Sequence, residues 1–136
     1  MDNKKISIRP VLNLTSKIPI EDFQNRIVRP ILKLQHDLIL QFFIFYCNKQ
    51  KVKISHLEKE SFQNLVDTII KKNINFKNQL LGSIIGQFTI KEFEFYKDND
   101  AEINKRILTM IGQRISDSQL EIKNFKTNNN DNRTKN

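Results

Sequence analysis

The segment of residues 20–48, IEDFQNRIVRPILKLQHDLILQFFIFYCN, decides the fold of this protein. Apolar residues recur in it at spacings of three and four, which is the period of one helix face. One stripe consists of Phe23, Ile27, Ile31, Leu34, Leu38, Phe42 and Phe45, and a second stripe beside it consists of Leu32, Ile39, Phe43 and Tyr46. A helix that is apolar on two sides contacts several neighbours. The pattern predicts the central helix of a bundle. Pro30 fits either a kink or the first turn of a new helix after Arg29, and we favour one short helix bent into a long one.

Two capping-box patterns indicate where further helices begin. Ser55 and Glu58 have the spacing at which a hydroxyl and a carboxylate satisfy each other's orphan amides, and Thr89 and Glu92 repeat it. The first box is expected to open a helix that ends near Lys72, because lysines suit the negative end of a helix. The second box is expected to open a short helix.

Two more helices complete the expected fold. One covers residues 75–87, and the last begins near residues 98–100. The seam of the last helix consists of Ile103, Ile107, Met110, Ile111, Ile115 and Ile122. The sequence therefore predicts an all-α protein, a single small bundle of about five helices over residues 20–122.

The two ends of the chain are expected to differ from this bundle. In residues 1–19, Ile6, Ile8, Leu12 and Leu14 alternate around Pro10, which favours an extended N-terminal arm lying in a groove of the bundle. Residues 123–136 hold no apolar residue after Phe125, which is typical of a disordered polar tail.

Length and composition limit the class of protein. A chain of 136 residues with 38% hydrophobic residues is one globular domain. The single cysteine, Cys47, excludes a disulfide framework and a cysteine-based zinc module within one chain.

The positive charge is concentrated at the ends. Of the formal net charge of +8, residues 1–20 carry three charges, residues 123–136 carry three, and residues 21–122 carry only two. A basic balance of this kind describes solubility and weak attraction rather than a specific site. Nucleic acid is therefore not the expected partner.

A membrane partner is not expected either. The most apolar run, LILQFFIFYC over residues 38–47, is about half as long as a bilayer span requires. The start, MDNKKISIRP, is not followed by the apolar stretch of a signal peptide. We expect a cytoplasmic protein.

Gly82 and Gly86 are spaced as small residues that let two helices approach closely. Glycine inside a helix costs about 1 kcal/mol relative to alanine, so a compensating contact is expected. The contact lies either within the chain or across a dimer axis. A phosphate loop is a weaker interpretation, because no lysine follows at the required spacing.

Arg26, Arg29 and Lys33 form one stripe of the central helix. The stripe is a candidate anion site, and its alternative is ion pairing with Asp22 and Asp37 at helical spacing. Arg29 has no partner of this kind, so it is expected to pair across the bundle with Asp37 or with a carboxylate of the last helix.

Neither histidine indicates a metal or catalytic site. His36 lacks a ligand at three or four residues along the helix, and His56 lies where a solvated first turn is expected. We expect no catalytic residue, no metal site and no cofactor.

Three strings resemble a known family: FQNRIVRPILKLQHDL (23–38), LLGSIIGQFT (80–89) and NKRILTMIGQRI (104–115). They are similar to a family of short helical bacterial proteins that carries the label "glyoxalase", over about residues 20–120. The resemblance implies a helical fold and a glyoxalase-like activity, and it transfers no active-site residue.

The residues themselves favour a non-catalytic helical module that acts through protein–protein contacts, either with an unknown protein partner or as a homodimer. The apolar surplus of the central helix and the glycine pair support this expectation. The alternatives are a glyoxalase-like enzyme or small-ligand binder, and weak non-specific nucleic-acid binding through the basic ends.

Overall fold

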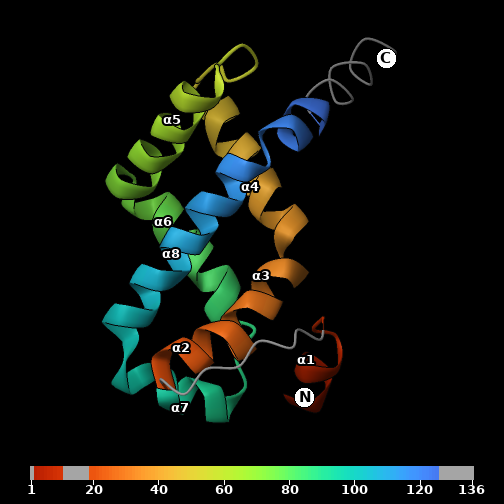
Figure 1. The fold of residues 1–136 in the computed structure, drawn as a ribbon, viewed down its shortest axis with the longest axis vertical. Coiled ribbons are helices and arrows are strands. Elements are labelled where there is room, and N and C mark those ends of the chain that lie inside the picture. Colours follow the sequence, from red (N-terminus) through yellow and green to blue (C-terminus); the bar gives the residue numbers. More distant parts are fainter. Residues whose placement is uncertain (1, 11–18, 126–136) are drawn as a thin grey trace.

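The computed structural model describes residues 2–10 and 19–125, and every element in these ranges is helical (Figure 1). The helices are α1 (Asp2–Ser7), α2 (Pro19–Phe23), α3 (Arg29–Leu34), α4 (His36–Lys49), α5 (Lys59–Lys72), α6 (Ile74–Ile85), α7 (Ile90–Asp98) and α8 (Asp100–Asp117). The predicted all-α fold is confirmed. The described residues form more helices than the five expected, because the central segment is divided and α1 is additional.

The central segment runs through α2, a π-helical turn at Gln24–Val28, α3 and α4. Pro30 lies in the first turn of α3, directly after the π-helical turn, and a further interruption separates α3 from α4. That interruption falls at Gln35, whose side-chain amide donates to the carbonyl oxygen of Ser83 in α6 at 3.1 Å. A contact with another helix therefore accompanies the break.

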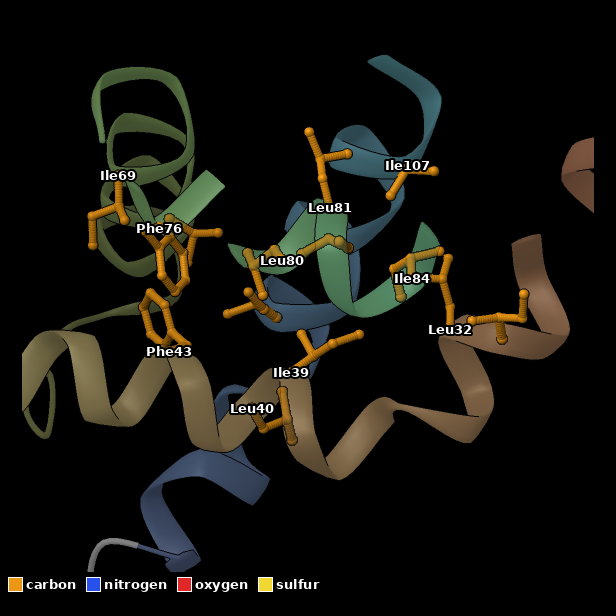
Figure 2. Close-up of a cluster of buried hydrophobic side chains, with 14 of the residues drawn as sticks. Leu32, Ile39, Leu40, Phe43, Ile69, Phe76, Leu80, Leu81, Ile84 and Ile107 are labelled. Carbon is orange, nitrogen blue, oxygen red and sulfur yellow. The ribbon is translucent and has the colours of Figure 1, made fainter. Parts of the chain in front are cut away.

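The core lies where α4, α5, α6 and α8 meet. Phe43 of α4 packs edge-on against Phe62 of α5, with ring centroids 5.7 Å apart, and all but about 1% of each side chain is buried. Figure 2 shows Phe43 pointing toward Phe76 of α6, with Ile107 of α8 on the opposite side of the cluster. The second apolar stripe of the central helix is thus the one that reaches the core, since Ile39 and Phe43 are fully buried.

The first stripe is buried only in part. Ile31 is fully buried, but Leu38 is 44% exposed and Phe45 is 64% exposed. The expectation that both apolar stripes of the central helix contact neighbours is therefore not met over α4, which presents part of its first stripe to solvent.

One of the two predicted capping boxes forms. Thr89 accepts from the backbone N–H of Glu92, and the Glu92 carboxylate accepts from the backbone N–H of Thr89. The box at Ser55 is wrong: the N-cap of α5 is Glu58, three residues later, and it makes no side-chain capping bond. Residues 50–58 form the connection from α4 to α5 instead, and Ile54 of this connection is buried, with 2% of its surface exposed.

The beginning of the chain is helical rather than extended. In α1 and the residues after it, Asp2, Lys5 and Arg9 follow helical spacing and reach the junction between α6 and α7. Lys5 donates to the carbonyl oxygen of Phe88 at 3.1 Å. The conformation of residues 2–7 is therefore decided by these long-range contacts and not by the alternating apolar pattern. Leu12 and Leu14 lie outside the described residues.

At the other end, α8 is followed by a turn at Ser118 and by helical residues 119–125. Ile122 is 1% exposed, so its predicted burial is confirmed, but it lies beyond the end of α8 and not within that helix. The bundle therefore extends slightly beyond the expected boundary at residue 122, and residues 126–136 lie outside the described part. None of the described helices has the length and hydropathy needed to span a membrane.

Candidate anion-binding groove

The structure separates the three residues of the predicted cationic stripe. Arg26 points to solvent and pairs with Asp22 at 3.6 Å, as the helical spacing predicted. Arg29 and Lys33 instead line a hollow of about 570 Å³ between α3, the start of α4 and α8. The predicted pairing of Arg29 with a carboxylate is not what is observed, because its Nε donates to the side-chain oxygen of Asn25 at 2.9 Å.

Arg114 of α8 faces this hollow from the opposite wall. We call the hollow, lined by Arg29, Lys33, His36 and Arg114, the arginine groove. Burial lowers the pKa of the Arg114 guanidinium, the positive charge of Arg29 lowers it further, and Glu121 acts in the opposite direction. Two guanidinium groups from two helices therefore share one partly buried space.

His36 connects the two walls of the groove. Arg114 Nη1 lies 3.1 Å from His36 Nδ1, and His36 Nε2 lies 2.8 Å from Glu121 Oε2. Because a guanidinium offers donors only, Nδ1 accepts in this arrangement and the ring proton sits on Nε2, which donates to the carboxylate. The partners of His36 come from across the bundle, which is why helical spacing alone did not find them.

The rest of the groove offers apolar surface beside the charges. Leu32 is buried, Met110 is half-buried, and both line the hollow. Asp117, also in the lining, accepts a hydrogen bond from the amide of Gln113 at 2.9 Å. The groove can therefore hold a carboxylate or phosphate against its guanidinium groups while apolar atoms rest on Leu32 and Met110.

Among the residues that the structure describes, one group places metal-ligating atoms close together, and it lies in this region. One atom each of His36, Asp37 and Glu121 lies within 4.8 Å of the others. An imidazole nitrogen with two carboxylate oxygens suits a divalent transition metal. Asp37 and Glu121 are exposed, and the cationic Arg114 lies next to the histidine ring, which opposes cation binding.

The two predicted packing glycines do not mediate a helix contact among the described residues. A Cβ on Gly82 would meet no atom within 4 Å, and a Cβ on Gly86 would lie 3.0 Å from the carbonyl oxygen of Gly82 in its own helix. Gly112 of α8 is the glycine at an interface, since its Cβ would lie 3.2 Å from Ile70 Cδ1 of α5. A contact between copies through Gly82 and Gly86 stays a prediction.

Arg114 and Gly112 were missed by sequence reasoning. Both lie within the isoleucine seam of the last helix, between Ile107 and Ile115. A cation and a glycine inside an apolar seam are the signals that could have indicated them.

We compared the chain with protein-family models, curated proteins and solved structures. No protein-family model, no curated protein and no solved structure matches the chain.

Proposed function

We propose that this protein is a non-catalytic binding module of the cytoplasm, and that the arginine groove takes an acidic segment of a partner protein. The observation that carries the proposal is the approach of Arg29 and Arg114, from α3 and α8, across one hollow. Like charges held together in a partly buried space favour an anion between them.

A protein segment suits the groove better than an isolated anion. Guanidinium groups bind carboxylates through paired hydrogen bonds, and the apolar surface of Leu32 and Met110 offers a seat for an aliphatic side chain beside the acidic one. The ion pairs formed among the described residues involve neither Arg29 nor Arg114, so an incoming carboxylate need not displace one.

The test is a binding titration with a fluorescent peptide of alternating glutamate and leucine. Arg29→Gln and Arg114→Gln are each expected to weaken binding about tenfold, the effect of losing one hydrogen bond to a charged group. Arg26→Gln is the matched control, because Arg26 belongs to the same stripe but points to solvent. Binding should also weaken as salt is added.

Two results would overturn this function. One is a peptide that binds no better than its lysine–leucine counterpart. The other is an equal loss of affinity in the Arg26→Gln control, which would indicate attraction by overall charge. A melting curve of each variant verifies that the fold is retained.

We also propose that the module forms a homodimer. Leu38 and Phe45 are two turns apart on α4, and both are exposed although they are large and apolar. Their position on one face of the central helix supports a second copy as the partner, since an isologous contact would cover the same two side chains on each chain.

A glyoxalase-like enzyme is the second candidate, and the grouping of His36, Asp37 and Glu121 is the observation that favours it. A divalent ion held there would polarise a carbonyl group as a Lewis acid. The test is lactoylglutathione formation by the purified protein, with loss on adding a chelator and in Glu121→Gln. Glu102→Gln is the control, because Glu102 is an exposed carboxylate of α8 paired with Arg106. Activity that persists in Glu121→Gln would contradict this candidate.

A further inference from the structure

A second hollow, of about 560 Å³, is lined by residues of α5, α6 and α8. Three lysines border it, one from each helix: Lys71 from α5, Lys77 from α6 and Lys105 from α8. We call it the lysine hollow. The packing of the three helices is what places these lysines around one hollow.

The charge of the lysine hollow favours an anion with more than one negative charge. Asp67 is the one carboxylate among the lining residues, against three ammonium groups. None of the three lysines takes part in an ion pair with another described residue. Lys77 is half-buried, where its charge is screened less by water than a fully exposed one. Compact ammonium groups that converge from several elements suit a phosphate.

The walls of the hollow add an apolar surface. Ile70 of α5 and Leu108 of α8 line it, and Gly112 forms part of the lining between them. A Cβ on Gly112 would lie 3.2 Å from Ile70 Cδ1, so a larger residue there would crowd α5 and fill the hollow. The absence of a side chain at this position maintains both the close helix contact and the depth of the hollow.

We propose that the lysine hollow binds a small molecule that carries phosphate groups and an apolar or aromatic part, of the size of a nucleotide. Its volume lies within the range of about 300–1,000 Å³ that is usual for ligand pockets. The lysines would hold the phosphates, and Ile70 and Leu108 would contact the apolar part. The cationic residues of the lysine hollow are different from those of the arginine groove, so this site does not depend on the function proposed above.

The experiment is isothermal titration of the full chain with ADP and with inorganic pyrophosphate at physiological salt. ADP is expected to bind, and pyrophosphate is expected to bind about tenfold more weakly because it cannot use the apolar wall. Lys77→Gln and Lys105→Gln should each weaken ADP binding about tenfold, since each removes one charged hydrogen bond. Lys53→Gln, an exposed lysine outside the lining, is the matched control and should leave the affinity unchanged.

The proposal would be overturned if neither probe gave a heat of binding, or if ADP and pyrophosphate bound with equal affinity. It would also be overturned if Lys53→Gln lowered the affinity for ADP as much as Lys77→Gln does. A fourth contradicting outcome is tighter binding of a single-stranded oligonucleotide than of ADP. The last would assign the lysines to a nucleic-acid backbone instead. Arg114→Gln should leave ADP binding intact, and its effect on the acidic peptide then tests the arginine groove separately. The lysine variants alter exposed or half-exposed side chains, so their folding is verified by an unchanged melting temperature.

Discussion

Among the ion pairs of the described residues, the pair of Arg9 and Glu92 is the most deeply buried. Its side chains are 7% and 12% exposed, and two hydrogen bonds of 2.8 and 2.9 Å join them. Arg9 also donates to the carbonyl oxygen of Gln87. Burial alone would raise the pKa of Glu92, but hydrogen bonds from Arg9 and Thr89 and the charge of Arg9 outweigh it, so the pKa is lowered overall. One carboxylate thus joins the start of the chain to the cap of α7.

This pair predicts that α1 is released in acid. A lowered pKa means that Glu92 contributes stability above its ordinary pKa of 4.5 and loses that contribution as the pH falls through the lower, folded value. The protection of the amides of residues 6–9, which are the hydrogen-bonded ones, should fall in that window relative to their intrinsic exchange rates. In Arg9→Met these amides should exchange rapidly at neutral pH already, because the carboxylate has lost its buried partner, a loss of about 3 kcal/mol. Exchange that is slow and insensitive to pH in both proteins would contradict the role of the pair.

Gly82 lies inside α6, and open space surrounds the position that a Cβ would occupy. Gly82→Ala is expected to raise the free energy of unfolding by about 0.5–1 kcal/mol, the helix propensity that glycine forfeits. Thermal melting measures this directly.

Gly112→Leu is the contrasting variant. It should lower the free energy of unfolding by about 1–3 kcal/mol, since the added side chain overpacks the contact with Ile70. For Gly82→Ala, a melting temperature below that of the wild type would contradict the expected gain. It would support a contact between copies through the face of α6 that carries Gly82.

At the scale of elements, α7 and α5 show how similar sequence patterns lead to different helix starts. The box at Thr89 forms because the chain turns sharply between α6 and α7, and Arg9 holds the same carboxylate from the other side. At Ser55 the buried side chain of Ile54 directs the backbone into a loop, and the hydroxyl contacts His56 Nδ1 at 3.0 Å instead.

These two starts predict unequal effects of the same substitution. Thr89→Ala should lower the free energy of unfolding by about 1 kcal/mol, the usual cost of removing an N-cap hydroxyl. Ser55→Ala should change it by less than about 0.5 kcal/mol, because the side chain is exposed and caps no helix. Denaturant unfolding of both variants compares them under one set of conditions. Equal losses would indicate that the Ser55 box forms in solution.

At the scale of the whole molecule, α8 runs across the bundle, with α5 on one side, α3 on the other, and α4 and α6 passing behind it (Figure 1). The arginine groove and the lysine hollow flank its outer surface and share Thr109 and Gln113 in their linings. Six cationic side chains, Arg29, Lys33 and Arg114 in one lining and Lys71, Lys77 and Lys105 in the other, therefore border hollows beside α8.

The proposed homodimer predicts a change of mass at this scale. Phe45→Ser should shift the protein from dimer to monomer in light scattering, because a large exposed apolar side chain at the contact is replaced by a small polar one. Its melting temperature at high dilution should change little. Lys91→Ser, an exposed residue of α7, is the control that should leave the mass unchanged. A strictly monomeric wild-type protein would end the dimer proposal.

The sequence by itself determined the helical fold, the seam of the last helix and the cap at Thr89. Each of these depends on residues close together along the chain, so periodicity and capping spacing reveal them. The pairing of Arg26 with Asp22 is local in the same sense. What periodicity could not show is which side of a two-sided apolar helix has neighbours, and so Phe43 and Phe45 were not distinguished.

Only the tertiary structure decided the sites. His36 meets Arg114 and Glu121 across the bundle, and the three lysines of the second hollow come from three helices. Contacts of this kind depend on the order and angles in which helices pack, which many distant side chains settle together. For the same reason α1 is a helix rather than an extended arm: its partners lie more than seventy residues away along the chain, beyond the reach of any local pattern.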